Sequence, residues 1–193
     1  MNVKHDKEKV LQTGMKLFWC TGYSKLGVDE ICKTTGMTKG AFYNAFKSKE
    51  NFLLSCMQAY GNMNVNHLDK QLNSKKGKAI DRILNTYINM FENQPQKNYI
   101  GCMTNNMMSE IGSFNETVSK ATAEAFENLL VVIEPVVQEA QKDGDISTAI
   151  NSKSITELIH TTFFGALTRA KSTRDYRKGI ATMTLLIKSL KSI

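Results

Sequence analysis

Apolar side chains recur at helical spacing along most of the chain, and this pattern is the strongest constraint on the fold. In the first segment they share one stripe, which consists of Val10, Leu11, Gly14, Met15, Leu17 and Phe18. Proline, which interrupts helices, occurs only twice in 193 residues, and the alternation typical of β-strands is scarce. The sequence therefore predicts an all-α fold of about nine helices.

The composition is that of a globular protein without a membrane partner. The hydrophobic fraction is 41% and the charged fraction is 22%, and both values are ordinary. No apolar run approaches the roughly 18 residues that cross a bilayer, and the first residues lack the apolar core of a secretory signal. We therefore expect a cytoplasmic protein.

The four cysteines are too few and too scattered for a disulfide framework. Cys20, Cys32, Cys56 and Cys102 are separated by 12, 24 and 46 residues, and these separations match no zinc-ligand spacing. We expect reduced thiols, no metal site and no cofactor.

Two short helices separated by a glycine-containing turn are predicted near the N-terminus. The first begins after Gly27 and ends at Gly36, and the second is capped by Thr38 and runs to about Phe46. This arrangement is a helix-turn-helix, whose second helix fits the major groove of DNA. Residues 1–50 carry nine lysines against five acidic residues, and this basic excess favours a polyanionic partner.

The stretch from Val10 to Leu54, and above all the segment GMTKGAFYNAFKSKE, closely resembles the TetR family of bacterial transcriptional regulators. The resemblance implies that the second short helix reads double-stranded DNA and that Lys39 contacts a guanine edge. It also implies phosphate contacts from Tyr43 and Lys49. The predicted DNA-binding residues are Thr38, Lys39, Gly40, Ala41, Tyr43, Asn44 and Lys49.

Helical spacing alone leaves a structural alternative open for some of these residues. Tyr43, beside Phe42, is also consistent with a half-buried aromatic, and Lys47 and Lys49 are consistent with a solvated turn. The family resemblance favours the DNA-binding interpretation. It implies a helix-turn-helix DNA-binding domain over residues 1–48 and an effector-sensing and dimerisation domain over residues 49–193.

The second domain is predicted to be a helical bundle. Residues 152–171 carry two apolar faces, so this helix should pack on more than one side. The second, mixed face consists of His160, Phe164, Leu167 and Lys171. The family resemblance implies a homodimer through the last two helices that binds a palindromic operator. The apolar face assigned to the last helix consists of Ile180, Met183, Leu186, Ile187 and Leu190.

Cys102 is the candidate sensor residue. It follows a loop and stands at the start of a predicted helix, where the helix dipole and unpaired N–H groups stabilise a thiolate. Lys171 is the candidate cation for this site. The segments GCMTNNMMSEI and FFGALTRAKS resemble the NemR-like, cysteine-sensing branch of the family. An ordinary buried cysteine is the competing interpretation.

Two functions follow from these expectations. The leading one is a dimeric TetR-like repressor that leaves its operator when an electrophile or oxidant reacts at Cys102. The alternative is the same repressor, induced by reversible binding of a small hydrophobic ligand in the C-terminal cavity. An enzyme is not expected, because the three histidines lie in separate segments and no paired-carboxylate or phosphate-binding motif is present.

Overall fold

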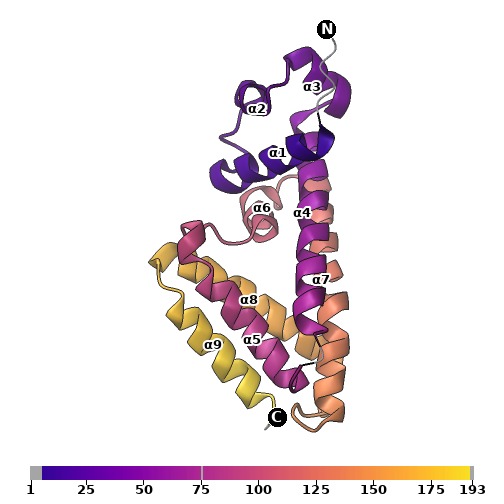
Figure 1. The fold of residues 1–193 in the computed structure, drawn as a ribbon, viewed down its shortest axis with the longest axis vertical. Helices are drawn as coiled ribbons and strands as arrows, with labels where there is room; N and C mark the ends of the chain where they lie inside the picture. Colours follow the sequence, from indigo (N-terminus) through magenta and orange to yellow (C-terminus); the bar gives the residue numbers. More distant parts are fainter. Residues whose placement is uncertain (1–5, 75, 192–193) are drawn as a thin grey trace. The chain divides into compact units, whose positions relative to one another are not determined.

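The computed structural model describes residues 6–74 and 76–191, and in this part of the chain all regular elements are helices, without a strand (Figure 1). It contains nine α-helices and one short 3-10 helix, which confirms the all-α prediction for the described residues. The α-helices are α1 (Lys7–Thr21), α2 (Val28–Thr35), α3 (Lys39–Phe46), α4 (Lys49–Leu72), α5 (Ala79–Glu92), α6 (Met103–Ile111), α7 (Glu116–Lys142), α8 (Ser152–Thr173) and α9 (Arg177–Ser189). The 3-10 helix η1 spans Pro95–Lys97.

The chain forms two compact units that differ from the predicted domains. The first unit comprises Met1–Met63 and Met103–Ala125, and the second comprises Asn64–Cys102 and Phe126–Ile193. The helix-turn-helix therefore shares its unit with α6 and the beginning of α7. The boundary expected after residue 48 remains a prediction about function, since it does not coincide with a division between compact units.

Four buried phenylalanines form the core of the helix-turn-helix. The rings of Phe46 and Phe52 lie 4.6 Å apart, and those of Phe42 and Phe52 lie 5.3 Å apart. Phe18 of α1 completes the cluster at 5.8 Å from Phe52. A Cβ atom on Gly14 would lie 2.4 Å from the Phe52 ring, so only glycine lets α1 approach α4 this closely.

The ends of the short helices are fixed as the sequence predicted. Gly36 closes α2 in the left-handed region with φ of 71°, where glycine carries no steric penalty. The Thr38 hydroxyl caps α3 by accepting the Ala41 N–H at 3.1 Å, and Ser48 caps α4 by accepting the Asn51 N–H at 3.0 Å. These caps satisfy N–H groups that have no partner inside the helix.

Pro135 does not break α7. The sequence predicts a kink or a break there, but α7 runs from Glu116 to Lys142 with Pro135 inside it. The prediction of a break was wrong, because a proline removes only one helical hydrogen bond and the packed apolar face of α7 outweighs that loss.

In the second unit α9 packs against α5 and α8 (Figure 1). A Cβ atom on Gly179 would lie 2.3 Å from the Phe91 ring, so glycine permits the close crossing of α9 and α5. Met183, Ile187 and Leu190 are buried within the single chain. The expectation that these residues face a dimer partner was wrong, because an apolar stripe does not reveal which helix covers it.

Both predicted apolar faces of α8 contain buried residues. These are His160, Phe164 and Leu167 on the mixed face, and Ile155, Ile159, Phe163 and Ala170 on the other.

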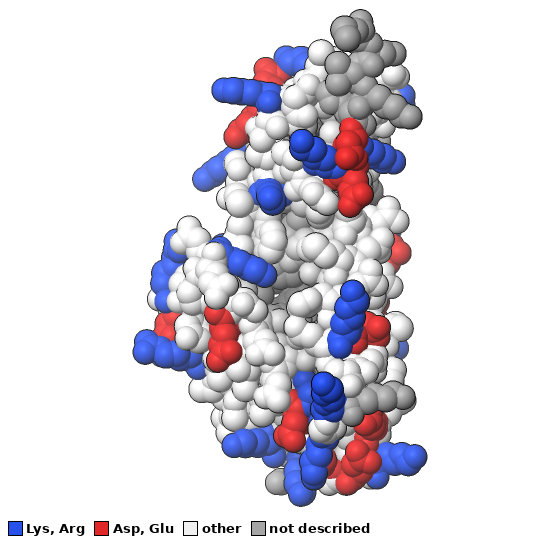
Figure 2. Space-filling view, in the orientation of Figure 1, with Lys and Arg blue, Asp and Glu red and all other residues white. Residues whose placement is uncertain are grey.

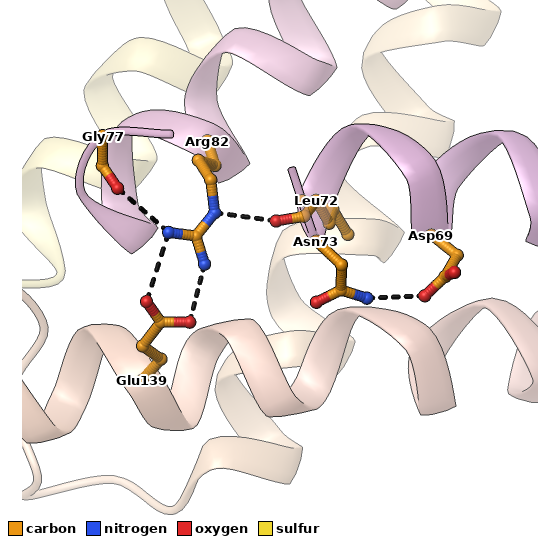
Figure 3. A network of polar contacts seen from close by, with 6 residues as sticks. All are labelled: Asp69, Leu72, Asn73, Gly77, Arg82 and Glu139. Carbon is orange, nitrogen blue, oxygen red and sulfur yellow. Dashed lines mark hydrogen bonds and ion pairs between the residues drawn. The ribbon is translucent and has the colours of Figure 1, made fainter. Parts of the chain in front are cut away.

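Arg82 of α5 joins three elements of the second unit (Figure 3). Its guanidinium donates to the carbonyl oxygens of Leu72 at 2.7 Å and Gly77 at 3.0 Å. It also forms a two-pronged ion pair with Glu139 of α7, at 2.6 and 3.2 Å. The Arg82 side chain is only 5% exposed, so these four bonds replace its hydration and hold the end of α4, the loop after it and α7 together.

We predict that Arg82→Leu lowers the free energy of unfolding by roughly 2–4 kcal/mol, because it leaves two carbonyls and a carboxylate without their donor. Arg169→Leu on the exposed side of α8 is the control and should change stability by less than about 0.5 kcal/mol. Urea unfolding followed by circular dichroism measures both. Equal stability of the two variants would contradict this role of Arg82.

Candidate functional site

The exposed face of α3 carries most of the predicted DNA-binding residues. Thr38, Lys39, Gly40 and Asn44 are exposed and Ala41 is half-buried. Tyr43 is 47% exposed, with its ring edge-on to the buried Phe42 ring at 5.4 Å. A Cβ atom on Gly40 would meet nothing closer than the Thr38 hydroxyl at 4.0 Å. Packing within the chain therefore does not require glycine there, and the close approach of DNA that the resemblance implies for Gly40 stays a prediction.

Lys39 is held by an acidic residue of the preceding helix. Its ammonium lies 2.7 Å from a carboxylate oxygen of Asp29 in α2, and both side chains are largely exposed. The hydrogen bond and charge of Asp29 raise the pKa of Lys39. A contact from Lys39 to a base would therefore require the ammonium to leave Asp29, and Asp29 would then compete with DNA for it.

Lys49 already has partners within the first unit. Its ammonium donates to the carbonyl oxygens of Tyr23 at 2.9 Å and Leu26 at 3.0 Å, and it lies 4.0 Å from the centre of the Tyr23 ring. These bonds tie the start of α4 to the turn between α1 and α2. The phosphate contact that the resemblance implies for Lys49 stays a prediction.

Basic and acidic side chains alternate over the face in Figure 2 and do not gather into one continuous basic patch. On this face, the basic side chains that contribute to the net charge of +7 are therefore not gathered in one place. Contacts to phosphates carry no sequence information, so the choice of DNA sequence would depend on the exposed face of α3.

Glu110 of α6 joins that helix to the helix-turn-helix. Its carboxylate accepts the backbone N–H groups of Tyr23 at 3.0 Å and Ser24 at 2.8 Å, in the turn after α1. Gly22 precedes them with φ of 84°, and a Cβ atom there would lie 2.8 Å from Glu110 Oε2. Both the backbone conformation and the space therefore require glycine at this position.

The electrostatics of Glu110 favour its ionised form. Burial opposes ionisation, but the N–H groups of Ser24 and Tyr23 and the charge of Lys49 outweigh it, so the pKa of Glu110 is lowered. The ionised carboxylate thus contributes stability above the pKa of the unfolded state. This contribution is lost as the pH falls through the lowered folded-state pKa.

Cys102 lies at the end of a well-fixed loop in the second unit and directly precedes Met103, the first residue of α6. Its side chain is 9% exposed. The buried Gln94 fixes the loop, since its side-chain oxygen accepts the Gly101 N–H at 3.2 Å and its carbonyl accepts the Tyr99 N–H at 2.8 Å. Cys102 therefore occupies the position before a helix that the sequence predicted.

The other three cysteines have different environments. Cys32 and Cys56 are buried. Burial raises the pKa of Cys56 to about 12, and it also raises the pKa of Cys32. These two thiols are poor nucleophiles at neutral pH. Cys20 is exposed, so any experiment on Cys102 must control for it.

The structure leaves the partnership of Lys171 and Cys102 as a prediction. Lys171 lies in the last turn of α8 and is exposed.

Among the described residues, no three His, Cys, Asp or Glu side chains gather as metal ligands would. Within the same residues, no helix is long and apolar enough to cross a membrane.

The sequence matches two protein families over most of its length. Residues 10–56 match the description "Bacterial regulatory proteins, tetR family". Residues 78–184, more than half of the chain, match "Tetracyclin repressor-like, C-terminal domain". The chain belongs to the TetR family. It is a regulator with a helix-turn-helix and not an enzyme, as the sequence predicted.

Two curated relatives match most of the chain. The HTH-type transcriptional repressor NemR of Escherichia coli is 24% identical over 177 residues, which are 91% of this chain and 89% of that protein. The transcriptional regulator AcuR of Cereibacter sphaeroides is 26% identical over 166 residues, which are 85% and 75%. The crystal structure of reduced E. coli NemR superposes with a TM-score of 0.83 at 23% identity over 95% of both chains. The fold is therefore shared with NemR.

Sequence reasoning missed Glu110 and the pairing of Asp29. Asp29 was visible as an acid in the first turn of a helix, but its partner Lys39 stands on another helix, and no spacing rule connects them. Glu110 meets its N–H donors only in the folded chain, since Tyr23 lies 87 positions away in the sequence. A glycine at position 22 was the available signal, and it also had the simpler interpretation of a helix end.

We predict that Asp29→Asn strengthens operator binding by about 1.5- to 5-fold, because Lys39 is no longer held by an exposed ion pair. The matched control is Glu30→Gln, which removes the neighbouring acid of the same helical turn. Fluorescence anisotropy with a duplex selected from a random-sequence pool measures both affinities. If the two variants gain equally, the effect is one of net charge and the specific competition by Asp29 is contradicted.

Proposed function

We propose that the protein is a transcriptional repressor of the TetR family that binds a palindromic operator as a dimer and leaves it when an electrophile or oxidant reacts at Cys102. The observation that carries this proposal is the position of Cys102, directly before α6, because α6 is tied to the helix-turn-helix through Glu110. A reaction at one end of α6 thus has a physical route to the DNA-reading helices.

The reaction would use the thiolate of Cys102. The thiolate is the nucleophilic form of a cysteine, and Cys102 directly precedes the start of α6, the positive end of the helix dipole. With an α,β-unsaturated carbonyl, the sulfur forms a bond to the β-carbon, the π electrons move to the oxygen, and the enolate takes a proton from water. With a hydroperoxide, the sulfur takes the distal oxygen as sulfenic acid, and the O–O electrons leave with the alkoxide.

The added group would disturb the start of α6. Cys102 is 9% exposed, so a bulky adduct does not fit without displacing its neighbours. The adjacent Met103 N–H donates to the Tyr60 hydroxyl of α4 at 3.3 Å. Glu110 stands seven residues further, about 10 Å along the helix. A shift of α6 would therefore change its hold on the turn at Tyr23 and Ser24.

Dimerisation would place two copies of α3 in successive major grooves. Since Met183, Ile187 and Leu190 are buried within one chain, the interface through α8 and α9 would use other residues. Leu158 on α8 is 42% exposed and Leu185 on α9 is 73% exposed. These exposed apolar side chains are the candidates for the contact with the second copy.

A specific observation supports the alternative of a reversible ligand. His160 is buried, and its Nε2 atom has no hydrogen-bond partner among the described residues, while Nδ1 pairs with the Tyr87 hydroxyl at 3.1 Å. Burial lowers the pKa of His160 to about 3, so the ring is neutral. A hydrophobic ligand with one polar group could satisfy Nε2 among the rings of Phe126, Phe163 and Phe164.

We predict that N-ethylmaleimide weakens operator binding of the wild-type protein by about 5- to 150-fold, the usual range of coupling between two sites. Cys102→Ser should bind the selected operator normally and lose this response, because serine forms no such adduct. Anisotropy measures the affinity, and mass spectrometry measures which thiol is modified.

Cys20→Ser is the matched control, since it removes the exposed thiol and should keep the full response. If Cys102→Ser still responds fully, the covalent proposal is wrong. The reversible ligand is then the better explanation, and His160 is the residue with which to begin.

A further inference from the structure

The first unit contains a cavity of about 470 Å³ between α1 and α4. Its walls are apolar and include Leu11, Met15, Trp19, Ala59, Tyr60 and Met63. Met63 lines this cavity and is 50% exposed, which is high for a large apolar side chain. A volume of this size lies within the range of small-molecule sites, roughly 300–1,000 Å³.

The lining indicates which molecules would fit. The Trp19 and Tyr60 rings meet edge to face at 5.2 Å and form one aromatic wall, and the two methionines supply polarisable, adaptable surfaces. Glu8, Gln12 and Lys16 stand at the polar rim. Since Glu8 and Lys16 carry opposite charges, the rim has no net preference for an ion. The cavity thus suits a neutral, mainly aromatic molecule.

Tyr60 connects this cavity to α6. Its ring lines the cavity, and its hydroxyl accepts the Met103 N–H, the first donor of α6, at 3.3 Å. A molecule packed against Tyr60 would therefore contact a residue that holds the start of α6. A second copy of the chain could also cover such an apolar hollow, and the experiment below separates this occupant from a small molecule.

We propose that the cavity between α1 and α4 is a binding site for a small, neutral aromatic molecule. All the residues that line it belong to the unit that contains the helix-turn-helix, and neither Cys102 nor His160 is among them. The proposal does not depend on the chemistry of Cys102, and it adds a non-covalent ligand site to a regulator whose proposed trigger is covalent.

The chain offers its own reporter, because Trp19 is its only tryptophan. The probe is N-phenyl-1-naphthylamine, which is neutral and aromatic and accepts energy from tryptophan. We predict saturable binding of one probe per chain with a matching fall in Trp19 emission. Cys102→Ser should bind the probe equally, which separates this site from the proposed sensor. Probe binding that never saturates would overturn the proposal.

Two variants test the location. Ala59→Leu fills the cavity and Met63→Glu places a charge on its wall, and each should weaken probe binding at least about tenfold. The matched control is Val131→Glu, which charges another exposed apolar side chain, 69% exposed, on α7, and should leave binding unchanged. Unchanged affinity in both cavity variants would overturn the proposal. The proposal would also be overturned if the wild type did not bind the probe while Trp19 was shielded from quenching by acrylamide. That result would indicate that a second copy of the chain covers the cavity.

Discussion

The hydrogen bonds from Tyr23 and Ser24 to the Glu110 carboxylate are the interaction on which the account of this protein depends. They make α6 part of the same compact unit as the helix-turn-helix. Gly22 permits them, because any other residue would meet the carboxylate and adopt a strained backbone. In the proposed mechanism, this contact carries a change at the start of α6 to the turn before the DNA-reading helices. The bond from the Met103 N–H to Tyr60 also ties α6 to α4.

Local patterns predicted the helices and the DNA-binding region well. Thr38, Gly36 and Ser48 act through their own backbone neighbours, so the sequence alone reveals them as helix ends. The burial of Phe42 and Phe46 and the exposure of Asn44 follow from helical spacing in the same way. The position of Cys102 before a helix was predicted because the signals for a helix start lie within a few residues of it.

Interactions between distant segments could not be predicted. The apolar stripe of α9 was visible, but the sequence did not show that the same chain covers Met183, Ile187 and Leu190. It also did not show that Gly179 packs on Phe91 of α5. The charged side chain of Arg82 is buried because three separate segments supply its acceptors. Lys49 was predicted to reach phosphate, yet two carbonyls hold its ammonium. Each of these depends on tertiary contacts that no single segment encodes.

The most direct test is the response of a Glu110→Ala variant to alkylation at Cys102, in a Cys20→Ser background. The ratio of operator dissociation constants after and before N-ethylmaleimide measures the coupling. Glu116→Ala is the control, because Glu116 is exposed and its ion pair with the exposed Lys120 lies within α7. The account predicts that the ratio falls towards one for Glu110→Ala, with Cys102 still modified by mass spectrometry, and stays at the wild-type value for Glu116→Ala. A wild-type ratio in Glu110→Ala would contradict it.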